Sequence, residues 1–238
     1  MSTKNIMLFV YDFPHKKTQD FLFRLIVEGY NIKYVIAAPW QKLNIQKSLI
    51  RNDHQHIGLV HPQAICKKFK INYLVADHNS QKATNYITKN PVDLYIISGA
   101  RILSHEVIKS CGRKVLNIHP GLLPDVRGLD TFLWSIYYKK PLGITAHFIT
   151  PKIDSGLLIY KERLPIKKDD TPFDVTLRLL EYQTDVLVKS IKILKNKDMG
   201  DLNNLANYKN AYNTKMNHNL EKKTLKQFKD WLAQFTYE

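Results

Sequence analysis

Short apolar runs of strand length alternate with amphipathic stretches over the first hundred residues. The apolar runs lie at 6–11, 32–38, 71–76 and 92–98, and the amphipathic segments between them, at 17–28, 62–70 and 80–88, have the periodicity of helices. Buried apolar strands separated by helices are typical of a parallel sheet that is covered on both faces. The pattern therefore predicts an α/β, Rossmann-like fold with a mostly parallel sheet and helices on both faces.

The second half of the chain has a different pattern. A brief strand at 115–118 leads into a turn rich in proline and glycine, Asp130 is expected to cap a helix that runs to Tyr138, and strands at 144–149 and 157–164 flank a turn. A longer helix should begin at Thr171, because a Thr cap, a Pro at the first helical position and an acid three residues after the cap occur together. One face of this helix is expected to be core: Phe173, Leu177, Leu180, Leu187, Ile191 and Leu194.

The C-terminal residues have weaker signals. Residues 199–218 are rich in Asn, Lys and Tyr and suggest a loop, while 221–232 could form a last helix that packs Phe228 and Trp231 on the domain. We therefore expect a catalytic domain at 1–195 and a short C-terminal extension at 196–238.

Composition excludes several classes of protein. With 238 residues, 44% of them hydrophobic, the chain can bury a core, which a disordered protein cannot. No uncharged apolar run approaches the roughly 18–20 residues that a membrane span needs, and the N-terminus lacks the apolar region of a secretory signal. Two cysteines, Cys66 and Cys111, do not make a disulfide scaffold. We expect a cytoplasmic protein without a membrane span.

The net charge of +15 is spread along the chain rather than gathered in one segment. Residues 1–160 carry +11 and residues 161–238 carry +4. A basic chain attracts anions of many kinds, including nucleotides, folates and tRNA. Because the excess is even and forms no arginine stripe, the charge favours small anionic ligands over nucleic acid.

Two common kinds of site have no matching motif. The turn after the first strand, Asp12-Phe13-Pro14-His15, carries neither of the glycine-rich phosphate loops. Asp53, His54, His56 and His61 lie close together in the sequence, but their spacing fits no closed zinc pattern. We expect no metal site, and a solvated loop at these residues.

Asn117 and His119 are the first candidates for catalysis. Two residues apart at the end of a strand, their side chains point to the same face, and the Pro120-Gly121 turn that follows fixes where they aim. An amide donor beside an imidazole suits acyl transfer, since one group can stabilise a developing oxyanion and the other can move a proton. Taken alone, a structural histidine hydrogen-bonded in the core fits this pair better.

Three segments in register change that interpretation. They are Arg101-Ile102-Leu103-Ser104, Leu116-Asn117-Ile118-His119-Pro120-Gly121-Leu122-Leu123-Pro124, and His147-Phe148-Ile149 running to Ile153-Asp154-Ser155-Gly156. Together they resemble the folate-dependent formyltransferases, which use 10-formyltetrahydrofolate as formyl donor. The spacing agrees with that family as well, with 13 residues between Leu103 and Asn117 and 34 between His119 and Asp154. A looser resemblance covers about residues 1–195.

The resemblance implies the roles of the site residues. It implies a catalytic set of Asn117, His119 and Asp154, and 10-formyltetrahydrofolate as co-substrate. It also implies a pteridine slot formed by the backbone around Arg101, Ile102 and Leu103 and by the loop Ile149, Thr150, Pro151 and Asp154.

Departures from the family's patterns bear on the amine substrate. The first turn lacks the glycine-rich loop of the purine-pathway enzymes, and the chain is too short for the full C-terminal domain of methionyl-tRNA formyltransferases. Gly121, Arg127 and Trp134 instead look like the enzymes that formylate nucleotide-linked amino sugars. A basic residue can hold a diphosphate and an aromatic ring can stack on a base or pack on a sugar. A surface ion pair at Arg127 and a core tryptophan at Trp134 are equally acceptable interpretations.

The resemblance suggests a dTDP-linked 4-amino-4,6-dideoxyglucose as substrate, in the synthesis of surface polysaccharide. Methionyl-tRNA, glycinamide ribonucleotide and an inactive folate-binding relative remain alternatives. A homodimer is the default expectation for such an enzyme.

Overall fold

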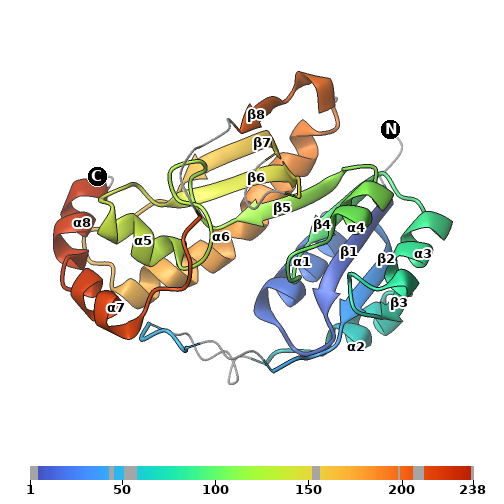
Figure 1. The fold of residues 1–238 in the computed structure, drawn as a ribbon, viewed down its shortest axis with the longest axis horizontal. Coiled ribbons are helices and arrows are strands. Elements are labelled where there is room, and N and C mark those ends of the chain that lie inside the picture. The colour runs from blue at the N-terminus through green and yellow to red at the C-terminus, as the bar shows by residue number, and fades with distance from the viewer. Residues whose placement is uncertain are drawn as a thin grey trace. The chain divides into compact units, whose positions relative to one another are not determined.

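The computed structural model describes residues 5–42, 46–50, 58–151, 156–197, 199–205 and 212–236 (Figure 1). Its internal contacts divide the chain into two compact units. The first comprises 1–42, 54–117 and 148–152, and the second comprises 43–53, 118–147 and 153–238. The domain boundary that the sequence predicts at residue 195 does not coincide with this division and stays a prediction.

A parallel sheet with helices on both faces forms the first unit. The strand order is β3-β2-β1-β4-β5, and all neighbouring strands in it run parallel. Helices α1 and α2 contact each other, and α3 and α4 contact each other. The first pair covers one face of the sheet and the second pair covers the other (Figure 1). The elements are β1 (Asn5–Tyr11), α1 (Lys16–Val27), β2 (Asn31–Ala38), α2 (Pro62–Lys68), β3 (Asn72–Val75), α3 (Gln81–Lys89), β4 (Leu94–Ile97), α4 (His105–Ser110) and most of β5 (Val115–His119).

Local signals in the sequence explain where these helices begin. Ser80 caps α3 by accepting from the backbone N–H of Ala83, and Ser104 caps α4 by accepting from that of Val107. Such side-chain caps satisfy backbone donors that the first turn of a helix leaves without a partner. The caps therefore fix the ends of the loops that follow β3 and β4.

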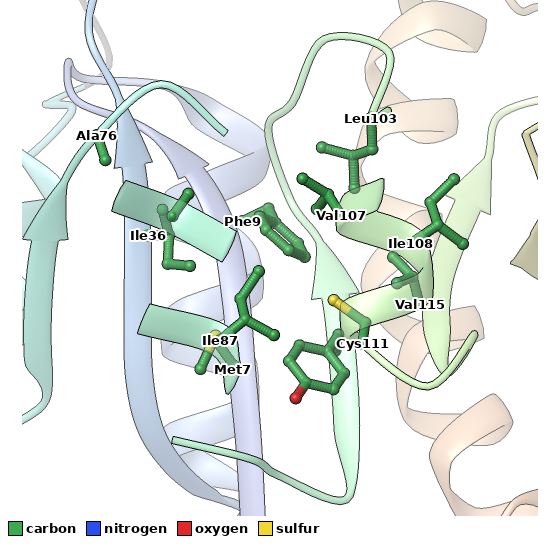
Figure 2. Close-up of a cluster of buried hydrophobic side chains, with 12 residues drawn as sticks. Met7, Phe9, Ile36, Ala76, Ile87, Leu103, Val107, Ile108, Cys111 and Val115 are labelled. Atoms are coloured by element: carbon green, nitrogen blue, oxygen red, sulfur yellow. The ribbon is translucent and has the colours of Figure 1, made fainter. Parts of the chain in front are cut away.

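One core cluster fills the space between the sheet and the helix pair α3 and α4. Figure 2 shows Phe9 and Ile36 from the strands facing Ile87 of α3, with Leu103 above Val107 of α4. Burying such side chains contributes about 1.5–3 kcal/mol each. Leu103, directly after the β4 loop, is thereby anchored in the core, and Ile149 packs against the same cluster.

The second unit combines strands with the C-terminal helices. Its strands follow the order β6-β7-β8, with β8 antiparallel to β7, and α6 lies along β7. The elements are α5 (Thr131–Tyr137), most of β6 (Gly143–Ile149), β7 (Gly156–Arg163), α6 (Pro172–Ile193), the 3-10 helix η2 (Met199–Asp201), β8 (Asn203–Leu205), α7 (His218–Leu225) and α8 (Phe228–Phe235).

The C-terminal extension packs on α5. The ring of Phe132 meets Phe228 at 6.0 Å and Trp231 at 5.7 Å between centroids, and the indole N–H of Trp231 donates to the carbonyl of Lys140 at 2.8 Å. The predicted packing of Phe228 and Trp231 is confirmed. The single helix predicted at 221–232 is wrong, because the chain forms two helices there.

Two further local predictions are also corrected. The capping box at Thr171 is confirmed, but the buried face of α6 begins with Val175 and Leu179, while Phe173 is 53% exposed. Apolar residues lie on two neighbouring faces of this helix's first turns, and contact with β7 selects one of them. Asp130 precedes α5 as expected but makes no capping bond, since its carboxylate binds Lys215 and Met216.

Within the described residues, no helix combines the length and apolar character that crossing a bilayer requires.

Candidate active site

Strand β5 carries both Asn117 and His119. It pairs with β4 in parallel, with Ile97 opposite Asn117, and its apolar residues Leu116 and Ile118 are fully buried. Because side chains alternate along a strand, Asn117 and His119 share one face and the two apolar residues share the other. The strand thus places Asn117 and His119 at its C-terminal end, and ligands bind at this end of the strands in parallel α/β sheets.

The imidazole of His119 is buried and held by the backbone. Its side chain is 4% exposed, and Nε2 donates to the carbonyl oxygen of Val126 at 3.0 Å. Since a carbonyl only accepts, Nε2 carries the proton, and Nδ1 is the nitrogen at which a neutral ring can accept one. The local structure therefore sets both the orientation and the protonated nitrogen of the ring.

Gly121 lies close against this ring. A Cβ at Gly121 would lie 2.8 Å from His119 Nε2 and 2.8 Å from the Val126 carbonyl oxygen. No real side chain tolerates such distances without moving its neighbours. Gly121 gives the imidazole the space that it occupies, and its predicted contact with substrate stays a prediction.

Hydrogen bonds from two threonines hold the turn after His119. Thr145, which is fully buried in β6, donates to the carbonyl of Gly121 at 2.7 Å and accepts from the N–H of Leu123 at 2.9 Å. The hydroxyl of Thr131, at the start of α5, donates to the carbonyl of Pro120. Buried backbone groups that are satisfied in this way make the turn costly to deform.

The folate residues predicted after β4 lie in the first unit. Leu103 is buried in the core cluster, whereas Ile102 is 68% exposed. Arg101 is half-buried, and its Nε is buried without a hydrogen-bond partner among the described residues, while its Nη1 lies 3.9 Å from Asp77 Oδ2. A buried donor of this kind and an exposed apolar side chain fit a ligand that offers both ring acceptors and a flat apolar surface.

The second predicted folate segment follows β6. Ile149 is half-buried and packs on the cluster that holds Leu103, so the structure brings these two predicted residues to one part of the first unit. Thr150 and Pro151 are exposed. Asp154 lies outside the described residues.

Arg127 and Trp134 lie in the second unit and have well-defined surroundings. The side chain of Arg127 is only 5% exposed, so the surface ion pair considered from the sequence is excluded. The ring of Trp134 is half-buried and stacks on Tyr138 with centroids 5.4 Å apart, and its indole N–H donates to the carbonyl of Thr214 at 2.9 Å. Their predicted contacts with substrate stay predictions.

Sequence reasoning missed a segment near residue 213 that binds the loop before α5. The N–H of Asn213 donates to the carbonyl of Arg127, and the N–H of Leu129 donates to the carbonyl of Asn213. Gly128 makes this approach possible, since it has φ +90° and a Cβ there would collide with the backbone of Asn213. Gly128 could have indicated a close backbone contact, but nothing in the sequence identifies Asn213, 85 residues away, as its partner.

The turn after β1 is built around a carboxylate. The hydroxyl of Tyr73 donates to Asp12 Oδ1 at 2.7 Å, and the backbone N–H of Asp12 donates to the carbonyl of Ala38 at 2.8 Å. Burial raises the pKa of the Tyr73 hydroxyl and the bond to Asp12 raises it further, which keeps that hydroxyl a neutral donor. The side chain of His15 caps α1 by accepting from the N–H of Thr18.

Of the four residues weighed as metal ligands, only His61 lies within the described residues. Its Nδ1 accepts from the N–H of Gln63 at 3.2 Å and so caps α2. Among the residues that the structure describes, no group of three or more His, Cys, Asp or Glu side chains is placed to hold a metal ion.

The chain is similar in sequence to several formyltransferases. It is 31% identical over 110 residues to the phosphoribosylglycinamide formyltransferase of Haemophilus influenzae, covering 45% of this chain and 52% of that protein. It is 29% identical over 170 residues to the methionyl-tRNA formyltransferase of Azobacteroides pseudotrichonymphae, covering 70% and 50% respectively. The chain thus spans about half the length of these two relatives.

The structure is similar to solved structures with the same fold. A sugar N-formyltransferase from Shewanella has a TM-score of 0.62 and 18% identity, over 95% of this chain and 88% of that chain. The family described as formyl transferase matches residues 54–191, more than half of the 238 residues, and this stretch includes Asn117, His119 and Asp154. This chain therefore belongs to the formyl transferase family.

Proposed function

We propose that the protein moves the formyl group of 10-formyltetrahydrofolate to the amino group of a nucleotide-linked amino sugar. The observation that carries formyl transfer is the placement of Asn117 and His119 on one face of β5, with the His119 ring fixed by Val126. The family uses 10-formyltetrahydrofolate as its formyl donor. Surface polysaccharide synthesis is the process that such a product would serve.

The reaction needs a nucleophilic amine and a stabilised oxyanion. The unprotonated amine attacks the formyl carbon, so that a nitrogen–carbon bond forms and the carbonyl oxygen gains a negative charge. Asn117 donates to this oxygen through its amide, and the imidazolium of His119 donates through Nδ1 while Nε2 keeps its bond to Val126. Groups aimed in advance at a developing charge lower the barrier without reorganising during the reaction.

Proton transfer completes the reaction. The carbon–nitrogen bond to N10 of the folate breaks, N10 takes up a proton, and the attacking amine loses one. The products are the N-formyl sugar and tetrahydrofolate. In this proposal Asp154 orients His119 and helps to carry the proton between the two nitrogens.

Arg101, Ile102, Leu103 and the segment 149–151 would hold the folate. The buried Nε of Arg101, which has no partner among the described residues, supplies a donor, and the exposed Ile102 supplies apolar surface. The folate provides the formyl carbon. The residues of this chain orient it toward the attacking amine.

The turn after β1 argues against a substrate that places a phosphate there. Phosphate-binding loops aim free backbone N–H groups at the anion, often at a helix N-terminus. Here the N–H of Asp12 binds Ala38, the side chain of His15 caps α1, and a carboxylate occupies the turn. Like charges repel, so this turn disfavours the phosphate of glycinamide ribonucleotide.

The C-terminal part of the chain favours an amino sugar as well. The likeness to the sugar N-formyltransferase from Shewanella extends over 95% of this chain, so an extension of this size is compatible with such an enzyme. Methionyl-tRNA is the second candidate, because the relative that formylates it matches 70% of this chain. Its binding would fall steeply with salt, since phosphate contacts release counterions.

A mass-detected transfer assay tests the proposal. The purified protein is incubated with 10-formyltetrahydrofolate and dTDP-4-amino-4,6-dideoxyglucose, and we expect a product heavier by one formyl group that the His119→Ala variant does not form. UDP-linked amino sugars, glycinamide ribonucleotide and methionyl-tRNA are run in parallel. Formylation of methionyl-tRNA or the ribonucleotide in preference to every amino sugar would overturn the sugar assignment, and no transfer to any amine would overturn the enzymatic one.

A further inference from the structure

The side chain of Asn79 joins the loops that follow β3 and β4 in the first unit. Its Nδ2 donates to the carbonyl of Ile102 at 3.0 Å, and its Oδ1 accepts from the backbone N–H of Ser104 at 2.8 Å. Both partners are unambiguous, because a carbonyl only accepts and a backbone N–H only donates. The side-chain amide of Asn79 thus brackets Leu103, because it binds the backbone of the residue before it and of the residue after it.

This arrangement imitates a neighbouring β-strand. In a planar trans peptide the C=O and the N–H point in opposite directions. The Ile102 carbonyl is directed to Asn79, so the N–H of Leu103 points away from it. The N–H of Ser104 is also directed to Asn79, so the carbonyl of Leu103 points away too. Asn79 therefore turns a donor and an acceptor of one residue toward the opposite side of the loop.

Asn79 is itself held in place by its own loop. Its backbone N–H donates to Asp77 Oδ1 at 2.9 Å, and the hydroxyl of Ser80 donates to the Asp77 carbonyl at 2.6 Å. The other carboxylate oxygen of Asp77 lies 3.9 Å from Arg101 Nη1. Two loops are thus connected by neutral hydrogen bonds and by one long ion pair.

Among the described residues, the other contacts of the bracketed loop lie mainly at its two ends. At its start, the N–H groups of Ser98 and Gly99 donate to the carbonyl of Phe9 at 3.0 and 3.1 Å. At its end, the Leu103 side chain is buried against Val107 (Figure 2). A buried side chain fixes where a residue sits but leaves the adjoining peptide planes free to rotate, so the contacts of Asn79 supply what the core does not.

We propose that Asn79 is a positioning residue for the folate slot, where it sets the peptide edge of Leu103 against which the pteridine binds. The inference rests on the proposed function. The aminopyrimidinone edge of a pteridine carries hydrogen-bond donors and an acceptor side by side. This edge matches the N–H and the C=O of Leu103, which point to the same side of the loop. Pre-setting this edge lowers the ordering cost of binding.

Equilibrium binding of tetrahydrofolate and steady-state kinetics separate this role from a structural one. In Asn79→Ala we expect the Kd for tetrahydrofolate and the KM for 10-formyltetrahydrofolate to rise about tenfold, because two hydrogen bonds are lost. The KM for the amine should not change. Asn79→Asp keeps the acceptor for Ser104 but puts a carboxylate against the Ile102 carbonyl, and it should weaken folate binding at least as much.

Asn85→Ala is the matched control, because Asn85 is an exposed residue of α3 whose side chain accepts a hydrogen bond from Gln81 of the same helix. All three variants should unfold at the wild-type temperature, since the bonds of Asn79 are exposed. Wild-type affinity in Asn79→Ala and Asn79→Asp would overturn the inference. If the wild-type protein itself binds no tetrahydrofolate, the proposed function fails instead.

Discussion

The ring of His119 occupies the space that a side chain at position 121 would need. A Cβ on Gly121 would lie 2.8 Å from His119 Nε2, against the same carbonyl of Val126 to which that nitrogen donates. Glycine at this position is therefore required by the placement of the imidazole. The bond to Val126 and the missing side chain at 121 together determine where Nδ1 points.

Gly121→Ala should displace the imidazole while the fold survives. A shift of about 1 Å in a catalytic group costs on the order of a hundredfold in rate, so we expect kcat to fall by about that factor. Gly200→Ala is the control, since a Cβ at Gly200 meets nothing within 4 Å. Steady-state kinetics and thermal unfolding of both variants test this. Equal kcat in Gly121→Ala and Gly200→Ala would contradict the relationship.

Asn117→Ala and Asp154→Ala should leave the protein folded and almost inactive. Removing one oxyanion donor, as in Asn117→Ala, typically lowers the rate by about 10²–10³. Removing a group that assists proton transfer, as in Asp154→Ala, typically lowers it by about 10²–10⁴. The exposed His105, at the first turn of α4, provides a His105→Ala control that should keep wild-type turnover. Turnover above about a tenth of the wild type in Asn117→Ala or Asp154→Ala would show that the residue has no part in the chemistry.

Much of the first unit could be predicted because its signals are local. The apolar runs at 6–11 and 32–38 became β1 and β2 almost residue for residue, since buried parallel strands leave a continuous apolar run in the sequence. The sequence pattern predicts the wrong starting residue for the buried face of α6, because Phe173 and Val175 lie on different sides of one turn. Only packing against β7 decides which side is buried, and that contact has no local signature.

The site shows the same division between local and distant signals. Asn117 and His119 were found because a strand and a rigid turn place them together within a few residues. The contacts of Asn79 with Ile102 and of Asp130 with Lys215 span 23 and 85 residues. No local sequence pattern near Asn79 or Asp130 indicates such a partner, so only the tertiary structure identifies these two contacts.

Trp134→Ala should weaken binding of the nucleotide sugar and leave folate kinetics unchanged. Stacking of an aromatic ring on a base contributes about 1–3 kcal/mol, so the KM for the sugar substrate should rise about tenfold or more. Trp134→Phe keeps a ring beside Tyr138 and should retain most of the affinity.

Trp40, which is 64% exposed in the first unit, gives the control variant Trp40→Ala. Its KM values should match those of the wild type. If Trp134→Ala unfolds at a lower temperature but keeps the wild-type KM for the sugar nucleotide, the prediction is wrong. Trp134 then has a structural role, through its hydrogen bond to Thr214.

The carboxylate of Asp130 ties the C-terminal extension to α5. It accepts from Lys215 Nζ at 2.9 Å and from the N–H of Met216 at 2.9 Å, and both side chains of the ion pair are largely buried. Asp130→Ala should therefore lower the free energy of unfolding by about 1–3 kcal/mol. Urea denaturation measures this, with the exposed Asp125→Ala as control. Equal stability of the two variants would show that the contact contributes nothing measurable.

The pair Asp170 and Arg178 should make stability depend on pH in the acid range. Arg178 donates to both carboxylate oxygens of Asp170, at 2.5 and 2.7 Å, and this bond holds the pKa of Asp170 below its usual value. The unfolded chain therefore binds the proton more readily, so the contribution of Asp170 is complete above about pH 4 and is lost as the pH falls through the lower folded pKa. Asp170→Asn should lower the free energy of unfolding by about 1–3 kcal/mol at pH 7 and by less at pH 3.5. Urea denaturation at pH 7 and pH 3.5 measures this loss, with the exposed Asp169→Asn as control. A loss of stability in Asp170→Asn that stayed constant or grew at pH 3.5 would contradict the prediction.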